Sequence, residues 1–156
     1  GSSHSYNALE GAGIPKTQLP HIYSLLMRQK LTSLSTNPDG STTLQLTPNG
    51  AHRLLRERMN RLTVHTPDKW DSHWRLISFK LPTSKDSERL LLYRRLKELN
   101  IHMVKRGLWV YPYDCFEVVQ QIATYCNLSR YMIYAEVLRF DGKTESELRR
   151  HYDLLK

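Results

Sequence analysis

Cysteines, long apolar runs and glycine-rich segments are all scarce in this chain of 156 residues. Its two cysteines, Cys115 and Cys126, are too few for a disulfide scaffold or a four-cysteine zinc site, so we expect reduced thiols in a cytoplasmic protein. No apolar run approaches the roughly 18 residues that a membrane helix needs, which predicts a soluble protein without a membrane partner. The seven glycines form no phosphate-binding loop.

Acidic residues are also in the minority, with 15 Asp and Glu against 23 Lys and Arg and a net charge of +8. A basic balance favours a polyanionic partner, although basic surfaces also serve solubility. The hydrophobic content of 40% and the aromatic content of 10% are typical of a folded globular protein. The length then suits one ordinary domain or two very small ones.

Residues that could carry catalysis show no recognisable pattern. The seven histidines have no metal-ligand spacing and none pairs with a cysteine in a known motif. Asp71, Asp86 and Asp114 lie near predicted loops or element ends, where aspartates usually cap helices or make turns. Cys115 begins a predicted helix, a position that favours a thiolate, but a structural role is the better interpretation. We therefore expect no enzyme activity, no cofactor and no metal ion.

The helical pattern breaks on both sides of a segment at residues 64–71, which predicts a linker between two regions. Residues 1–5 are typical of an expression remnant and carry no fold information. We expect a DNA-binding region over 6–63, a second domain over 72–141 and a C-terminal helix within 142–156.

The sequence of the first region predicts a helix, then a β-hairpin and then a second helix. Thr17 caps the first helix, and a short helix near residues 7–11 precedes it. Strands over 31–36 and 41–46 follow, joined by the type I turn signal Asn37-Pro38-Asp39-Gly40. Thr47 and Pro48 then open another helix as its cap and first residue. The apolar stripe of that helix is expected at Ala51, Leu54, Leu55, Met59 and Leu62.

This order in a basic segment is the tail of a winged helix-turn-helix, with the first helix in the major groove. Residues suited to base edges are Gln18, His21, Ser24 and Arg28. Residues suited to phosphates are Lys16, Thr17, Lys30 and Ser41, with Arg53 and Arg56 as weaker candidates. The simpler alternative is that any surface helix carries polar residues. A winged domain also needs helices before the recognition helix, so we expect a truncated or reduced module.

The second region predicts strands and helices in the order βαββαβ, the split-βαβ or ferredoxin-like plan. The strands are expected at 74–81, 101–105, 108–111 and 131–140, and the helices at 84–100 and 116–126. A final helix over 145–155 would trail off from this domain. The fold class is therefore α+β, a partial winged helix-turn-helix followed by a ferredoxin-like domain.

Aromatic residues concentrate on the strands of this second region. Core packing is the simplest interpretation, but an open sheet face with Tyr residues could also stack single-stranded bases. A third use is sheet-to-sheet packing in a dimer, because edge strands must be covered. The candidates for that dimer interface are Trp109, Tyr111 and Tyr134.

Several short motifs, in the same order along the chain, carry a resemblance to a known family. The run WDSHWRLISFKLP at 70–82 and the run GLWVYPYD at 107–114 are the longest, with the helix at 89–99 between them. The run LQLTPNG at 44–50 precedes them. Together they resemble the PaaX-like transcriptional repressors over about residues 14–140.

The resemblance implies a winged DNA-binding domain joined to a ferredoxin-like domain. That second domain is similar to the small nuclease-like subunit of CRISPR adaptation complexes, which dimerises through its sheets. Those nuclease relatives hold a divalent metal with an aspartate at the end of the first strand, where this chain has Lys80. A cation cannot replace a carboxylate ligand, so metal-dependent cleavage at that position is not expected.

We therefore expect a non-enzymatic transcriptional repressor that binds double-stranded DNA as a homodimer on a near-palindromic operator. The resemblance adds a small-molecule inducer, an acyl-CoA in known members, of unknown identity here. One alternative is a CRISPR-associated metal-dependent nuclease that uses Asp71, Asp86 or Asp114. Another is an accessory or scaffolding protein that binds nucleic acid by charge alone.

Overall fold

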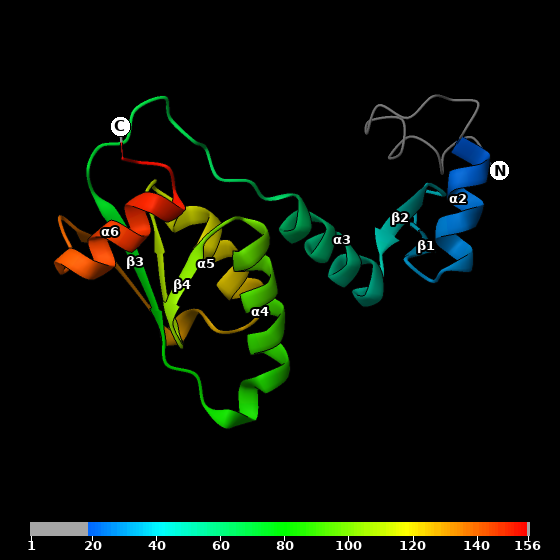
Figure 1. Cartoon of the computed structure of the whole chain (residues 1–156). Helices are drawn as coiled ribbons and strands as arrows, with labels where there is room; N and C mark the ends of the chain where they lie inside the picture. The colour runs from blue at the N-terminus through cyan, green and yellow to red at the C-terminus, as the bar shows by residue number, and fades with distance from the viewer. Residues whose placement is uncertain (1–18, 156) are drawn as a thin grey trace. The chain divides into compact units, whose positions relative to one another are not determined.

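The computed structural model describes residues 19–155, which divide into two compact units with the boundary between Arg58 and Met59. The described part of the first unit contains one hairpin and two helices, the second of which continues past the boundary (Figure 1). The order predicted from the sequence is confirmed, and the helix expected near 7–11 lies outside the described residues. In chain order these elements are α2 (Leu19–Arg28), β1 (Thr32–Thr36), β2 (Thr42–Leu46) and α3 (Pro48–Arg61).

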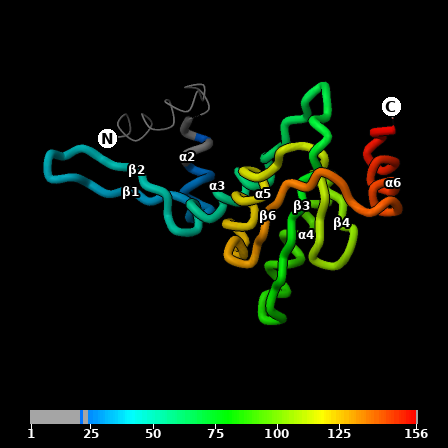
Figure 2. Tube along the Cα trace, turned by 90° about the vertical axis from the view of Figure 1, so that its left-hand side faces the viewer, coloured from blue at the N-terminus to red at the C-terminus, as the bar shows by residue number. Residues whose placement is uncertain are grey.

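The β1–β2 hairpin closes through the predicted turn. The carbonyl of Asn37 accepts the N–H of Gly40 at 3.0 Å, and Gly40 has a φ of 84°, a conformation that glycine adopts without steric cost. Thr36 pairs with Thr42 at the turn and Thr32 with Leu46 at the open end. The result is an extended two-stranded ribbon (Figure 2).

The start of α3 packs against the segment that joins α2 to β1. Thr47 Oγ1 accepts the N–H of Gly50 at 3.0 Å and donates to the Lys30 carbonyl at 2.6 Å, so Thr47 caps α3 as predicted. A Cβ on Gly50 would lie 2.0 Å from the carbonyl oxygen of Leu31. Glycine is therefore required there by close backbone approach.

The predicted apolar stripe of α3 is only partly correct. Met59 is buried and Leu62, just after the helix, packs against the same core, which belongs to the second unit. Leu54 and Leu55 are 48% and 52% exposed, and Ala51 is exposed too. Helical spacing identified the face, but among the described residues only its C-terminal end reaches a core.

The second unit contains a four-stranded antiparallel sheet in the order β4-β5-β3-β6. Its strands and main helices follow the predicted βαββαβ order, which is confirmed. The elements are β3 (Trp74–Phe79), η3 (Thr83–Lys85), α4 (Asp86–Glu98), β4 (His102–Lys105), β5 (Leu108–Tyr111), α5 (Phe116–Tyr125), η4 (Ser129–Tyr131), β6 (Met132–Val137) and α6 (Gly142–His151).

One face of this sheet is covered by α4 and α5 (Figure 1). Alternate residues of β3 point to it, and Ile77 stands between Trp109 on β5 and Tyr134 on β6. Fully buried residues of the two helices, Leu92 and Ile122 among them, complete the main core. This is the larger of the two hydrophobic clusters.

The opposite face is partly covered by α6. Trp74, Val110 and Leu148 form a second buried cluster, and Trp74 Nε1 donates to Glu145 at 2.9 Å. The helix begins at Gly142, earlier than predicted, because Asp141 accepts the N–H of Thr144 as its cap. The expectation that α6 trails off from the domain is therefore wrong, since its apolar side completes a core.

The segment between α3 and β3 is also part of the second unit. Arg95 on α4 donates Nε to the Met59 carbonyl at 3.0 Å and its Nη2 to the Leu62 carbonyl. Val64 packs against the main core. These contacts place the boundary between the units before residue 59, whereas the sequence predicted a linker at 64–71. Among residues 19–155 no helix has both the length and the apolar character to cross a membrane.

Candidate functional site

The predicted DNA-reading residues that the structure describes share one face of α2. His21, Ser24 and Arg28 are spaced by three and four residues, and all three are exposed. Residues at that spacing on a helix are neighbours. The prediction that these side chains share one exposed face of the helix is therefore confirmed for these three. Lys16, Thr17 and Gln18 lie outside the described residues.

Further cations lie around the C-terminal end of α2. Arg53 on α3 donates Nη1 to Gln29 Oε1 at 2.6 Å, which brings its guanidinium beside the end of α2. Lys30 is exposed and follows the helix with a φ of 56°. Arg56 is exposed three residues further along α3. Arg28, Lys30 and Arg53 thus belong to one basic region of the first unit.

Ser41 has a different role from the phosphate contact that the sequence predicted. Its hydroxyl donates to Asp39 Oδ1 at 2.6 Å and accepts from Asn37 Nδ2 at 2.9 Å. Hydrogen bonds from Ser41 lower the pKa of Asp39 below its usual value. The hydroxyl is therefore committed to the turn, and a carboxylate stands at the tip of the hairpin.

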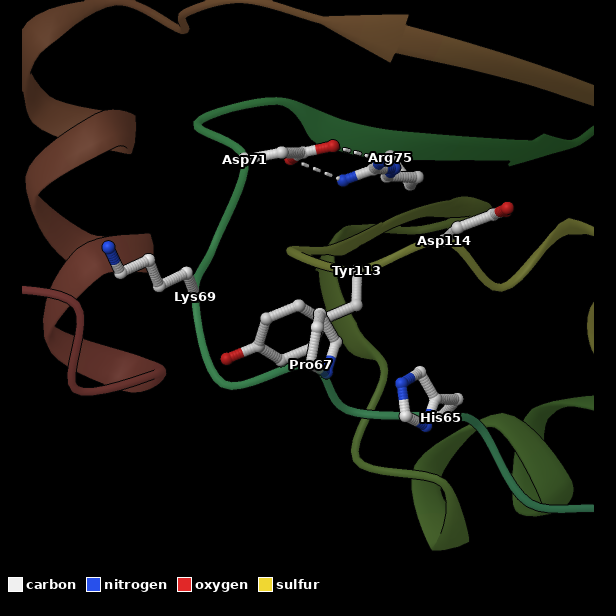
Figure 3. A pocket seen from close by; sticks show the side chains of 7 residues that line it. All are labelled: His65, Pro67, Lys69, Asp71, Arg75, Tyr113 and Asp114. Carbon is white, nitrogen blue, oxygen red and sulfur yellow. Dashed lines mark hydrogen bonds and ion pairs between the residues drawn. The ribbon is translucent and has the colours of Figure 1, made fainter.

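The second unit contains a cavity of about 400 Å³ before the start of β3 (Figure 3). This volume lies within the range of small-molecule pockets, roughly 300–1,000 Å³. Sequence reasoning did not find it, because its walls come from the segment before β3, from β3 and from the loop after β5. The lining residues are His65, Pro67, Lys69, Asp71, Arg75, Tyr113 and Asp114.

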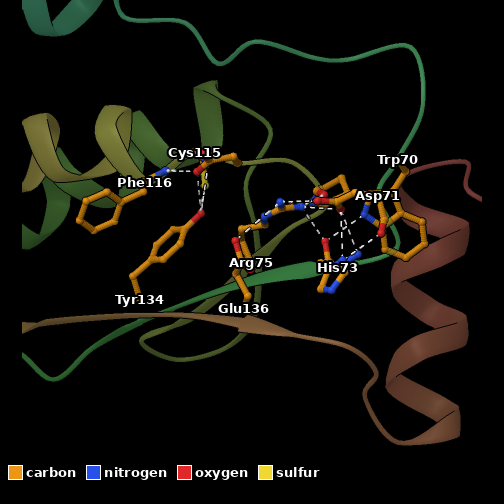
Figure 4. A network of polar contacts seen from close by, with 10 residues as sticks. Trp70, Asp71, His73, Arg75, Cys115, Phe116, Tyr134 and Glu136 are labelled. Carbon is orange, nitrogen blue, oxygen red and sulfur yellow. Dashed lines mark hydrogen bonds and ion pairs between the residues drawn. The ribbon is translucent and has the colours of Figure 1, made fainter.

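Arg75 in this wall is neutralised by Asp71 (Figure 4). Its Nη1 and Nη2 donate to the two carboxylate oxygens at 2.8 and 2.6 Å, a bidentate pair. Nη1 also donates to the carbonyls of His73 and Pro112, both at 2.8 Å. The hydrogen bond from Arg75 lowers the pKa of Asp71. The pair fixes the start of β3, and both Nη atoms of the buried guanidinium already have acceptors.

Asp114 and Tyr134 together hold the start of α5. Asp114 Oδ1 accepts the N–H of Phe116 at 3.1 Å and the hydroxyl of Tyr134 at 3.3 Å. The same hydroxyl accepts the N–H of Cys115 at 3.3 Å (Figure 4). Burial raises the pKa of the Cys115 thiol to about 12. A thiol with that pKa stays protonated at neutral pH, which agrees with the structural role predicted for it.

Residues 67–149 match the family described as "PaaX protein central Cas2-like domain". The match covers more than half of the chain and runs from the segment before β3 into α6. The chain belongs to the PaaX-like family. The two longest motifs that suggested it, at 70–82 and 107–114, lie inside the matched residues. A search among curated proteins found no match.

The carboxylates considered for metal binding are spread over the Cas2-like domain. Asp71 precedes β3 and shares the cavity with Asp114, whereas Asp86 follows β3 and pairs with Arg89 at 3.3 Å. Lys80, directly after β3, is exposed. Within residues 19–155 no three His, Cys, Asp or Glu side chains are arranged to hold a metal ion.

The expected dimer residues lie on the helix-covered face of the Cas2-like sheet. Trp109 is fully buried and Tyr111 is 6% exposed, so both side chains pack inside a single chain. Tyr134 is half-buried and shares their face, since it stands opposite Ile77. Aromatic content suggested an interface, but these rings belong to the core, and two of the three present no surface to a second copy.

Proposed function

We propose that this chain is a DNA-binding transcriptional repressor of the PaaX-like family. In this proposal a partial winged helix-turn-helix precedes a ferredoxin-like, Cas2-like domain. The observation that carries it is the exposed row of His21, Ser24 and Arg28 on one face of α2. Imidazole, hydroxyl and guanidinium groups in such a row suit the edges of successive base pairs in a major groove.

The basic residues around this row support the same proposal. Lys30 and Arg53 flank the end of α2 and would contact the phosphates that position the helix. Arg56 would extend that contact along α3. The hairpin contributes less than predicted, because the Ser41 hydroxyl is occupied and Asp39 would repel a phosphate.

We also propose that the repressor acts as a homodimer without nuclease activity. The sheet face opposite α4 and α5 supports the dimer: Ile133 on β6 is 69% exposed there, and Leu108 pairs with Ser78 beside it. Lys80 supports the absence of cleavage, because an ammonium group repels the divalent cation that a carboxylate would hold. The inducer remains a prediction, for which the cavity beside Asp71 offers space.

Selection of bound duplexes from a random DNA pool tests this function. An enriched inverted repeat, with half-sites about one helical turn apart, would support a dimeric repressor. A pool without enrichment, bound with a steep salt dependence, would instead make the protein a binder of nucleic acid by charge alone. Loss of the input DNA only when a divalent metal is added would overturn the non-enzymatic proposal.

Arg28→Ala is the sharpest single change for this test. If Arg28 makes a bidentate contact with a base, the variant should lose about 1–3 kcal/mol of binding and relax the preference at one base pair. Titration of the operator and of its single-base variants measures both effects. Arg58→Ala on α3, an exposed arginine to which we assign no contact, is the charge-matched control. An equal loss on every sequence would make Arg28 a phosphate contact.

A further inference from the structure

Four cations of the Cas2-like domain meet at one end of its sheet. Lys80 follows β3, Lys105 ends β4, Arg106 lies in the β4–β5 turn, and Arg130 precedes β6. All four are exposed. They come from three separate parts of the chain, around residues 80, 105–106 and 130, so no single run of basic residues predicted this group.

Backbone hydrogen bonds fix these four residues at the same end. The N–H of Phe79 donates to the carbonyl of Gly107 at 2.7 Å, which joins the end of β3 to the β4–β5 turn. The N–H of Lys80 donates to the carbonyl of Tyr131 at 3.3 Å, which joins it to the residue after Arg130. The basic end, as we call Lys80, Lys105, Arg106 and Arg130, is therefore a property of the fold and not of one mobile segment.

The charge of the basic end is not neutralised locally. Within residues 19–155 none of its four side chains forms an ion pair with a carboxylate. The nearest acidic residue along the chain after Lys80, Asp86, is paired with Arg89. Asp71, Asp114 and Asp141 lie at the opposite end of the sheet, before β3, after β5 and after β6. Four exposed cations without a carboxylate partner thus lie together at this end of the sheet.

We propose that the basic end is a second DNA-binding surface, which contacts the phosphate backbone of duplex DNA without reading its sequence. This inference rests on the proposed function and adds to it a contact by the Cas2-like domain. Exposed ammonium and guanidinium groups on separate elements suit a row of phosphates, and each contact releases condensed counterions. Base readout stays with α2, so the basic end adds affinity and salt dependence but no sequence preference.

The test compares two double variants of the full chain with the wild type. K105Q/R106Q removes two charges from the basic end, and K143Q/R150Q removes two exposed charges from α6 as a matched control. Affinity for the selected operator and for an unrelated duplex of equal length is measured from about 50 to 200 mM salt. Circular dichroism and thermal unfolding check that both variants remain folded.

We expect K105Q/R106Q to weaken binding to both duplexes by the same factor and to reduce the slope of log K against log salt by about two. The control should keep the wild-type slope. The inference is overturned by an unchanged slope in K105Q/R106Q, or by an equal change in both variants. A wild type that binds anionic phosphatidylserine vesicles through these residues, while its DNA slope does not depend on them, would also overturn it.

The same experiment separates this inference from the proposed function. If the wild type binds duplex DNA but K105Q/R106Q behaves like it, only the second surface is lost. If the wild type binds no duplex at all, the proposed function and this inference both fail. Loss of operator preference in K105Q/R106Q would contradict the division of roles, because it would assign sequence readout to the basic end.

Discussion

Asp71 and Arg75 show how a single pair of side chains can fix the entry to a domain. The guanidinium is almost buried, while the side chain of the carboxylate is about half exposed, at 49%. Arg75 also binds the carbonyls of His73 and Pro112, so one cation joins the segment before β3 to the loop after β5. A cation buried to this degree depends on its partner, because its desolvation would otherwise be uncompensated.

Replacement of Asp71 by Asn should therefore destabilise the Cas2-like domain by about 1–3 kcal/mol at neutral pH. The effect should depend on pH in a defined direction. Because Arg75 lowers the pKa of Asp71 in the folded protein, its contribution is complete above the unfolded value near pH 3.9 and is lost as the pH falls through the folded value. Urea unfolding of the wild type and of Asp71→Asn at several pH values measures how their free energies of unfolding depend on pH.

The difference in free energy of unfolding between wild type and Asp71→Asn should shrink below about pH 4. Asp68→Asn, three residues earlier and exposed, provides the control and should differ little from wild type. A difference that stays constant down to pH 2 would mean that the ionised pair contributes nothing and that only the geometry of the loop matters.

Among the elements, the β4–β5 hairpin is constrained both by backbone conformation and by close backbone approach. Gly107 has a φ of 78°, and a Cβ there would lie 2.5 Å from the carbonyl oxygen of Phe79. The conformation and the space both exclude a side chain. The turn therefore lies close to β3, and the same hairpin carries Lys105 and Arg106 of the basic end.

Gly107→Ala should lower the free energy of unfolding by about 1–3 kcal/mol, since it places a side chain in a strained and occupied position. Gly142→Ala is the matched control. A Cβ on Gly142 meets nothing within 4 Å, and it begins α6, so this change should be neutral or stabilising by up to about 1 kcal/mol. Thermal unfolding of the two variants measures this difference in stability. Equal melting temperatures would contradict the requirement for glycine at position 107.

The helix α6 offers a second test at the level of elements. Leu148 is 1% exposed between Trp74 and Val110, so Leu148→Ala should cost about 2–5 kcal/mol. Leu138→Ala removes the same atoms from a side chain that is 73% exposed and should stay within about 0.5 kcal/mol of wild type. Chemical denaturation compares them. A small effect at Leu148 would restore the view that α6 is an appendage.

Sequence patterns predicted the elements well because most of their signals are local. The cap at Thr47 and the turn at 37–40 depend on neighbouring residues alone, and both are confirmed. Which apolar face reaches a core is decided by distant contacts, so the predictions for Leu54 and for the C-terminal helix, whose Leu148 is buried, were wrong. The cavity and the basic end gather residues that are far apart in sequence, which periodicity cannot detect.

At the scale of the whole molecule, the two faces of the Cas2-like sheet differ in how they are covered. The helix side is closed by α4 and α5, and α6 covers only the part of the other side around Trp74. Ile133, opposite Ser78, remains exposed on that side. A second copy would bury this part, whereas the rings of Trp109 and Tyr111 are already covered.

Ile133→Glu should therefore convert the proposed dimer to monomers, because it would place charges inside an apolar interface. Sedimentation equilibrium measures the mass. Leu90→Glu introduces the same charge on α4, at a leucine that is 66% exposed, and should leave the dimer intact. A monomeric wild type, or a variant that remains dimeric, would exclude this face as the interface.

Arg95 has a consequence for the order in which the chain opens. The carbonyls of Met59 and Leu62, at the end of α3 and just after it, accept hydrogen bonds from Arg95, which is buried in the same second unit. The last turn of this helix should therefore unfold together with the core of that unit. Amide hydrogens of that turn should exchange with solvent at the slow rate of global unfolding, while those near Pro48 follow faster local fraying. One continuous helix would then belong to two cooperative folding units, with its N-terminal part released first.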